Sequence, residues 1–211
     1  MSHIKNLLFD LGGVIMDIRK ENCIEAFRRL GLMNASSYFG DYSQHGPFMA
    51  LERGDISTDL FHAELRKDLP EGVSDGEIDE AFCRFLVGIP PRRLDELEAL
   101  GKNYNMCLLS NTNPIMWHSA IRHDFEQKVH DIDYYFPGGT VTSFEANALK
   151  PEPAIFEYTV QKLDIVPDET LFLDDSVMNL EAAAALGFKT LHVPTDTEFY
   201  DLLKKYFSQT A

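Results

Sequence analysis

Four short apolar runs, each followed by a helical pattern, constrain the fold of this chain more than any other feature of its sequence. Hydrophobic residues predominate in the first three of these runs without regular polar alternation, which is typical of parallel strands buried on both faces. The runs cover residues 4–9, 106–109, 170–173 and 189–193. The order strand, helix, strand, helix predicts an α/β protein with one parallel sheet and right-handed crossovers. Another strand is expected at residues 134–136 with nearby Val141.

The segments between the predicted strands carry helix start and stop signals. Residues 91–100 place leucines on one stripe and end at Gly101, and residues 178–186 are alanine-rich and end at Gly187. Glycine often follows a helix because it adopts the left-handed conformation easily. Residues 153–163 begin with a proline, which suits the first helical turn. These signals predict helices that cross over between the strands.

One long segment, from about residue 17 to residue 88, interrupts this order with helical patterns and no convincing strand. Helices are expected at residues 20–30 and 58–69, and a capping box, Ser74 to Glu77, precedes a further one. An insert after the first strand of a parallel sheet lies over the carboxyl ends of the strands, where such sheets bind ligands. The sequence therefore predicts a core of residues 1–16 and 89–211 and an all-helical cap of residues 17–88.

The charge balance narrows the possible partners. The 211 residues carry a formal net charge of -15, which argues against nucleic acid or an anionic membrane as a partner. An acidic protein that handles phosphate needs a local positive potential, and a bound cation can supply it.

Cysteine usage and the N-terminus bear on the compartment. Three widely spaced cysteines without a Cys-x-x-Cys pair support neither a zinc site nor a disulfide framework. No basic start with a long apolar stretch opens the chain, and no segment approaches the roughly 20 apolar residues of a membrane-spanning helix. We expect a cytoplasmic protein.

Carboxylates follow two of the predicted strands. Asp10 ends the first apolar run, and Asp174 and Asp175 end the run at 170–173. Three acids that meet at one sheet edge repel one another unless a hard cation with oxygen ligands lies between them. Magnesium suits carboxylates, water and a substrate phosphate, so we expect Mg²⁺ here.

Hydrogen-bonding and cationic residues follow the other runs. Ser110 and Asn111 come after a strand and can donate to phosphate oxygens. Lys150 precedes the helix expected at 153–163, whose N-terminus also favours anions. A lysine here offsets the charge shared by Asp10 and a phosphate, so that the aspartate can attack phosphorus in two successive displacements.

Four sequence motifs in this order resemble those of the haloacid dehalogenase-like (HAD) hydrolase superfamily. They are FDLGGV at 9–14, LSNTN at 109–113, LKPEP at 149–153 and LDDS at 173–176. The resemblance covers nearly the whole chain and implies a Rossmann-like parallel sheet core with the helical cap of subfamily I. ERGDIS at 52–57 fits the branch that contains α-D-glucose-1-phosphate phosphatases.

The resemblance also implies a role for each motif residue. Asp10 would be the nucleophile and a Mg²⁺ ligand, with the Gly12 carbonyl as a second ligand. Asp175 would bind the metal directly, and Asp174 would bind directly or through water. The remaining implied residues are Ser110 and Asn111 as phosphoryl ligands, Lys150 as the neutralising charge, and Asn179 as a brace of the metal loop.

Gly12 departs from the pattern of most phosphatases of this superfamily, which carry an acid/base aspartate there. General acid–base help is worth roughly 10²–10⁴-fold. One reading is a substrate with a good leaving group, such as a sugar-1-phosphate. A second borrows a proton carrier, for which His45 in the cap or a metal-bound water is a candidate. A third is a protein that binds or senses phosphate ligands and scarcely turns over.

Two further alternatives concern the cap and the chemistry. His45 and Arg53 are candidate substrate contacts, although a single His or Arg in a helical cap is more often a surface or packing residue. A 2-haloacid dehalogenase also attacks with an aspartate and lacks the second one, but it needs no metal. The adjacent Asp174 and Asp175 favour a cation, so a phosphatase acting on a small phosphorylated metabolite ranks first.

Overall fold

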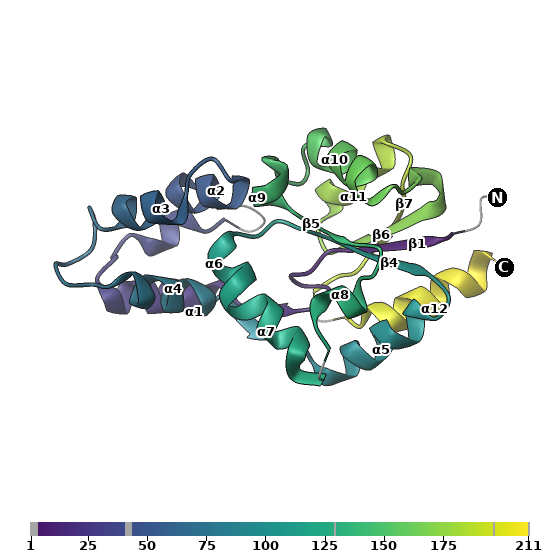
Figure 1. The fold of residues 1–211 in the computed structure, drawn as a ribbon, viewed down its shortest axis with the longest axis horizontal. Helices are drawn as coiled ribbons and strands as arrows, with labels where there is room; N and C mark the ends of the chain where they lie inside the picture. The colour runs from purple at the N-terminus through teal and green to yellow at the C-terminus, as the bar shows by residue number, and fades with distance from the viewer. Residues whose placement is uncertain (1–3, 41–43, 129, 196, 211) are drawn as a thin grey trace.

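The computed structural model describes residues 4–40, 44–128, 130–195 and 197–210. Residues 1–3, 129, 196 and 211 of the predicted core and residues 41–43 of the predicted cap lie outside these ranges. A five-stranded parallel sheet in the order β5-β4-β1-β6-β7 forms its centre (Figure 1). The predicted parallel α/β core is confirmed. The strands are β1 (Asn6–Phe9), β4 (Asn105–Ser110), β5 (Thr140–Thr142), β6 (Thr170–Asp174) and β7 (Lys189–His192).

The register of the central strands aligns their carboxyl ends. Phe9 lies opposite Leu108 on one side and Leu173 on the other. The Asp10 backbone N–H then donates to the Leu173 carbonyl at 2.8 Å. Because the strands are parallel and in step, the polar residues that end β1, β4 and β6 emerge at one edge of the sheet.

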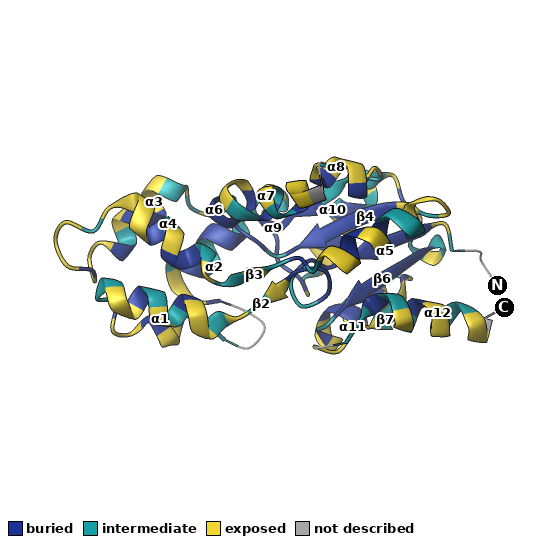
Figure 2. Ribbon diagram, turned by 90° about the horizontal axis from the view of Figure 1, so that it is seen from below, coloured by how far each residue is buried: buried dark blue, intermediate teal, exposed yellow. Residues whose placement is uncertain are grey.

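Helices cover both faces of the sheet because β1 is apolar on both sides (Figure 2). Leu7 and Phe9 belong to a core cluster that includes leucines of α5 (Pro91–Gly101) and Phe199 of α12 (Phe199–Thr210). Leu8 belongs to a second cluster with residues of α10 (Pro153–Leu163) and α11 (Val177–Ala185). Successive side chains of a strand point to opposite faces of the sheet, so β1 contributes to a separate hydrophobic core on each face. In Figure 1, α10 and α11 lie above the sheet and α5 and α12 below it.

Four helices form a separate lobe beside the sheet edge (Figure 1). They are α1 (Lys20–Leu30), α2 (Gly46–Arg53), α3 (Thr58–Leu65) and α4 (Asp75–Cys83). Phe48 lies at their centre, with ring centroids 5.2, 5.1 and 5.0 Å from those of Phe27, Phe61 and Phe82. The predicted capping box opens α4. We call this lobe the cap and keep residues 17–88 as its predicted extent.

The expectation of no strand in residues 17–88 is wrong at both ends of the segment. β2 (Asp17–Ile18) and β3 (Leu86–Gly88) pair antiparallel between the cap helices and the sheet (Figure 2). Arg93 of α5 holds this ribbon to the core, because it donates to Asp17 at 2.7 Å and to the Ile15 carbonyl at 3.1 Å. Strands of two and three residues are too short for a period-2 pattern to show.

The strand expected at 134–136 is also wrong, whereas Val141 lies in β5 as expected. Residues 132–135 form a helical turn, α8 (Ile132–Tyr135), because Asp131 caps it by accepting from the Tyr134 N–H at 3.0 Å. Across the described ranges, no helix is long and apolar enough to cross a membrane. The other short elements are Ala35–Tyr38, α6 (Pro114–Met116), a π-helical turn at Trp117–Ile121, α7 (Arg122–Phe125), Glu126–Lys128, α9 (Ser143–Ala146) and Pro167–Glu169.

Candidate active site

Three carboxylates converge at the carboxyl edge of the sheet. Asp10, Asp174 and Asp175 each offer an oxygen, and these oxygens lie within 4.8 Å of one another. Asp10 and Asp174 are buried, and Asp175 is half-buried. The donor set consists of carboxylate oxygens, and Gly12, in the loop after β1, lines the same pocket as Asp10 and Asp175. Such a set fits a hard divalent cation such as Mg²⁺.

Lys150 is the cation of this cluster. Its Nζ lies 2.7 Å from Asp10 Oδ1, 2.8 Å from Asp174 Oδ2 and 3.3 Å from the Leu109 carbonyl oxygen. The lysine side chain is 2% exposed. One ammonium therefore faces three acids, which leaves the site with excess negative charge when all three are ionised.

Asn111 holds the backbone of Lys150 in place. Its side-chain Nδ2 donates to the Lys150 carbonyl at 3.0 Å, and its Oδ1 accepts from the Lys150 N–H at 2.9 Å. This pair of bonds ties the loop after β4 to the loop before α10. Ser110 is buried at the end of β4, with its Oγ 3.4 Å from the Asn111 carbonyl oxygen. Of the two predicted phosphoryl ligands, Asn111 thus lies beside the lysine and lines the pocket described below, whereas Ser110 is not among the described residues that line it.

The two adjacent aspartates have different surroundings. Asp174 is fully engaged: its oxygens accept from the Ser176 N–H at 2.8 Å, from Asn179 at 3.0 and 3.2 Å, and from Lys150. Asp175 instead turns toward the Gly13 backbone, where an added Cβ would lie 2.7 Å from its Oδ2. Asp175 can therefore offer oxygen to a cation, while Asn179 fixes the carboxylate of its neighbour.

Burial and mutual repulsion set the ionisation of the cluster. Burial raises the pKa of Asp10 to about 7; Lys150 opposes this shift, while the negative charges of Asp174 and Asp175 add to it. Burial and the charge of Asp174 likewise raise the pKa of Asp175. For Lys150, burial alone would lower the pKa, but the neighbouring carboxylates outweigh it and raise the value. A divalent cation would offset the repulsion that contributes to these raised carboxyl pKa values.

A pocket of about 140 Å³ opens above the carboxylates, between core and cap. Lys150 and the Asn111 amide lie in its floor. The described residues that line the floor are Asp10, Gly12, Asn111, Lys150, Asp175, Ser176 and Asn179, and those that line the cap side are Ile18, Phe39, Gly40, Gln44, Glu52 and Phe85.

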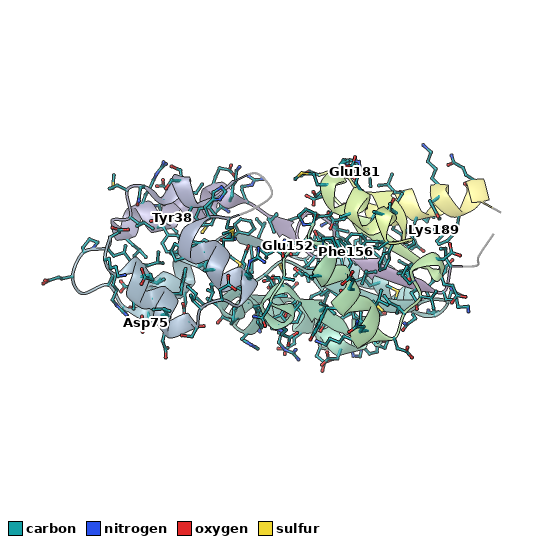
Figure 3. All side chains as sticks on the ribbon, turned by 90° about the horizontal axis from the view of Figure 1, so that it is seen from above. Tyr38, Asp75, Glu152, Phe156, Glu181 and Lys189 are labelled. Atoms are coloured by element: carbon teal, nitrogen blue, oxygen red, sulfur yellow. The ribbon has the colours of Figure 1, made fainter. Side chains whose placement is uncertain are left out.

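The two cap residues singled out in the sequence do not line this pocket in the described part of the chain. His45 is exposed and begins α2, where its N–H donates to the Tyr38 carbonyl at 2.8 Å. Arg53 reaches the core instead, because it forms a bidentate pair with Glu152. Figure 3 labels Glu152 where the cap and the core meet. A direct substrate contact by His45 or Arg53 remains a prediction.

Glu52 and Gln44 are pocket residues that sequence reasoning missed. Gln44 Nε2 lies 2.5 Å from Glu52 Oε1. Burial raises the pKa of Glu52 to about 8, and the Gln44 hydrogen bond opposes the shift. Glutamate is usually a surface residue of a helix, so nothing in the local pattern separates Glu52 from the solvated acids of the cap.

Comparison with known proteins relates this site to a family. A family model described as haloacid dehalogenase-like hydrolase matches residues 4–187. D-ribitol-5-phosphate phosphatase of Bacteroides thetaiotaomicron is 35% identical over 187 residues, which cover 89% of this chain and 90% of that protein.

Comparison with solved structures points to the same family. A HAD family enzyme of Bacteroides thetaiotaomicron, in complex with magnesium and inorganic phosphate, superposes with a TM-score of 0.88 at 38% identity, covering 94% of this chain and 98% of that one. A predicted HAD-like family hydrolase of Porphyromonas gingivalis gives 0.89 at 28% identity, covering 98% of both chains. L-2-haloacid dehalogenase of Xanthobacter autotrophicus gives 0.60 at 18% identity, covering 90% and 77%, and shares the fold alone. The chain belongs to the haloacid dehalogenase-like hydrolases.

Proposed function

We propose that this chain is a magnesium-dependent phosphatase that hydrolyses a small phosphorylated metabolite through an aspartyl-phosphate on Asp10. One observation carries the proposal: three carboxylates lie within 4.8 Å of one another, and Lys150 contacts two of them. The similarity to a sugar-alcohol phosphatase and to an enzyme with bound magnesium and phosphate supports it.

The metal would be held by Asp10, the Gly12 carbonyl and Asp175. Asp174 already accepts from Lys150, Asn179 and a backbone N–H, so we assign it to orienting the lysine or to a contact through water. When bound, Mg²⁺ supplies positive charge for the phosphate oxygens and for the attacking carboxylate.

The protein residues then carry the two displacements. An Asp10 oxygen bonds to phosphorus while the ester oxygen leaves with a proton. Water next attacks the same phosphorus, the bond to Asp10 breaks, and inorganic phosphate is released. Lys150 holds Asp10 at 2.7 Å and offsets the charge that gathers there. Ser110 and the Asn111 amide would position the transferred group.

The pocket and one relative indicate which phosphorylated metabolites should be tested first as substrates. A pocket of about 140 Å³ suits a phosphate with a small organic group. A relative that acts on ribitol 5-phosphate makes polyol and sugar phosphates the first class to test. Sugar-1-phosphates, which have the good leaving group that Gly12 favours, belong to the same screen. Because Gly12 offers no acid, we expect them to react faster than sugar-6-phosphates.

Dehalogenation and phosphate sensing are the competing functions. Dehalogenase relatives are 22–25% identical, and that chemistry needs no metal, which leaves the three converging acids unexplained. A phosphate sensor would account for Gly12 but would show no turnover.

A screen of phosphorylated metabolites with Mg²⁺ tests the proposal. We expect phosphate release that disappears with a chelator and with Asp10→Asn, and that survives Asp59→Asn, a change of an exposed cap aspartate. Chloride release from 2-chloropropionate that survives the chelator would favour the dehalogenase. Phosphate binding without turnover on every compound would favour the sensor.

Location and partners follow from composition alone. The net charge of -15 disfavours nucleic acid and anionic membranes as partners. The three cysteines at positions 23, 83 and 107 are free thiols, which fits a reducing compartment, and we propose the cytoplasm.

A further inference from the structure

Gly12 stands at the position where most phosphatases of this superfamily carry an acid/base aspartate. The proton for the leaving group must therefore come from another residue. Four ionisable side chains line the pocket in the described part of the chain: Asp10, Lys150, Asp175 and Glu52. The proposed function already commits the first three to attack, charge neutralisation and metal binding. Glu52 is the remaining one, and it lines the cap side of the same pocket.

Contacts with the core fix the position of Glu52. The Ser143 Oγ lies 2.6 Å from the Glu52 carbonyl oxygen and accepts from the Thr112 N–H at 3.0 Å. Thr112 belongs to the loop that also carries Asn111, so a short chain of hydrogen bonds joins Glu52 to the phosphate side of the site. At Gly54, an added Cβ would lie 2.3 Å from the Phe144 carbonyl oxygen. The C-terminal turn of α2 is therefore docked on the core.

The surroundings of the Glu52 carboxyl favour a bound proton. The residue is 7% exposed, and among the described residues no cation lies within ion-pair distance of it. Its neighbour in sequence, Arg53, points away to Glu152. A buried carboxyl without a cation stays neutral at physiological pH, as the raised pKa of about 8 reflects. Gln44 Oε1 is buried and has no hydrogen-bond partner among the described residues, so the amide can turn to accept the Glu52 proton.

The charged groups described on α3 and α9, the helices packed against α2, do not line the pocket: Asp59 is exposed, and Glu64 pairs with Lys67 at 2.6 Å. His62 of α3 lies 2.7 Å from Asp79, and Glu145 of α9 pairs with Lys162 at 3.1 Å. The ionisable groups that share the pocket with Glu52 are therefore the core cluster below it.

We propose that Glu52 is the general acid and base of the reaction, in place of the side chain that Gly12 lacks. In the first step Glu52 gives its proton to the ester oxygen as the bond from that oxygen to phosphorus breaks and the bond from Asp10 forms. In the second step the Glu52 carboxylate takes a proton from water as the water oxygen bonds to phosphorus and Asp10 leaves. Glu52 ends protonated, ready for another turnover. This inference rests on the proposed function.

Leaving-group dependence tests this role. kcat/KM reports the steps up to departure of the leaving alcohol, and p-nitrophenol departs readily without a proton donor. For Glu52→Gln we expect kcat/KM to fall about 10²–10⁴-fold on ribitol 5-phosphate and to change less than about threefold on p-nitrophenyl phosphate. The aryl ester should also give a burst of p-nitrophenolate, because the phosphorylated Asp10 then waits for unassisted water. Glu52→Asp, which keeps the carboxyl, should lose less on the alkyl ester.

Three results separate this inference from its alternatives. Equal losses on both esters would overturn it, because they would indicate a binding or packing role. Wild-type rates in Glu52→Gln would overturn it while leaving the proposed function intact. Absence of magnesium-dependent phosphate release by the unmodified protein would overturn both. Glu64→Gln, at a half-buried position of α3 outside the pocket where Glu64 pairs with Lys67, serves as the matched control and should match the unmodified protein on both esters.

Discussion

Replacing Lys150 with methionine should destabilise the metal-free protein strongly. The substitution keeps an unbranched side chain of similar length but removes the ammonium. Asp10 and Asp174 then lose the ammonium that lies 2.7 and 2.8 Å from their carboxylate oxygens. The site is closed to solvent, because the side chains of Lys150, Asp10 and Asp174 are 2, 11 and 0% exposed. Breaking a buried ion pair on one side costs about 3–5 kcal/mol, because the other charge stays buried and uncompensated.

The loss should also depend on pH in a defined direction. In the unmodified protein the pKa of Asp10 is raised to about 7 from the ordinary 3.8, so the stability contributed by its proton is present below pH 3.8 and is lost as pH rises through 7. Without Lys150 the pKa of Asp10 rises further, so the variant continues to lose stability above pH 7, by up to about 1.4 kcal/mol per pH unit. The gap between the two proteins should therefore widen above pH 7.

Urea unfolding in the presence of a chelator, followed from slightly acid to slightly alkaline pH, measures this gap. Saturating Mg²⁺ should return about 2–3 kcal/mol, because it binds the same carboxylates in the folded state. Lys162→Met removes an exposed lysine from its pair with Glu145 and should cost at most about 1 kcal/mol. A cost for Lys150→Met as small as that of the control, or a gap that closes at high pH, would refute the reasoning.

Three further changes test other parts of the site. Gly13→Ala, at φ +79, places a Cβ 2.7 Å from Asp175 Oδ2, so calorimetric titration should show roughly 10-fold weaker Mg²⁺ binding. Gly72→Ala, at φ +93 with open space around it, should leave Mg²⁺ binding unchanged. Equal effects of the two changes would contradict the role of the close contact between Gly13 and Asp175. Glu52→Gln should flatten the pH dependence of the free energy of unfolding. The Glu52 pKa is raised to about 8, so its bound proton contributes stability that is present below pH 4.5 and lost as pH rises through 8, roughly 5 kcal/mol in total. An unchanged pH profile would contradict this. Arg53→Ala removes a half-exposed ion pair between cap and core, so thermal unfolding should show a loss of about 1 kcal/mol, and a loss above about 3 kcal/mol would mean that the pair is not screened.

The parallel sheet and its crossover helices could be predicted because apolar runs and helix-end residues are local sequence patterns that recur along the chain. Runs such as 170–173 are mostly apolar, and the parallel register then brings Asp10 and Asp174 to one edge. The helix at 153–163 begins and ends as its proline and spacing indicate. The predicted magnesium cofactor and the HAD resemblance are confirmed by comparison, while the individual residue roles stay predictions.

What the sequence could not indicate depends on tertiary contacts. β2 and β3 are separated by the whole cap and have two and three residues, so only their pairing identifies them. Residues 134–136 carry aromatic side chains typical of strands, but the Asp131 cap begins a helical turn at Ile132 that includes Tyr134 and Tyr135. Glu52 looks like a surface acid until α2 docks on the core and buries it. The proton carrier is a property of the interface between cap and core.

Direct detection of the phosphorylated aspartate tests the central claim. A rapid quench of the enzyme mixed with Mg²⁺ and p-nitrophenyl phosphate, followed by borohydride reduction, converts an acyl phosphate to homoserine, which mass spectrometry can locate in the peptide that contains residue 10. We expect homoserine at position 10 in the unmodified protein, more of it in Glu52→Gln, and none with a chelator. Phosphate release at full rate without any modification of Asp10 would contradict the account.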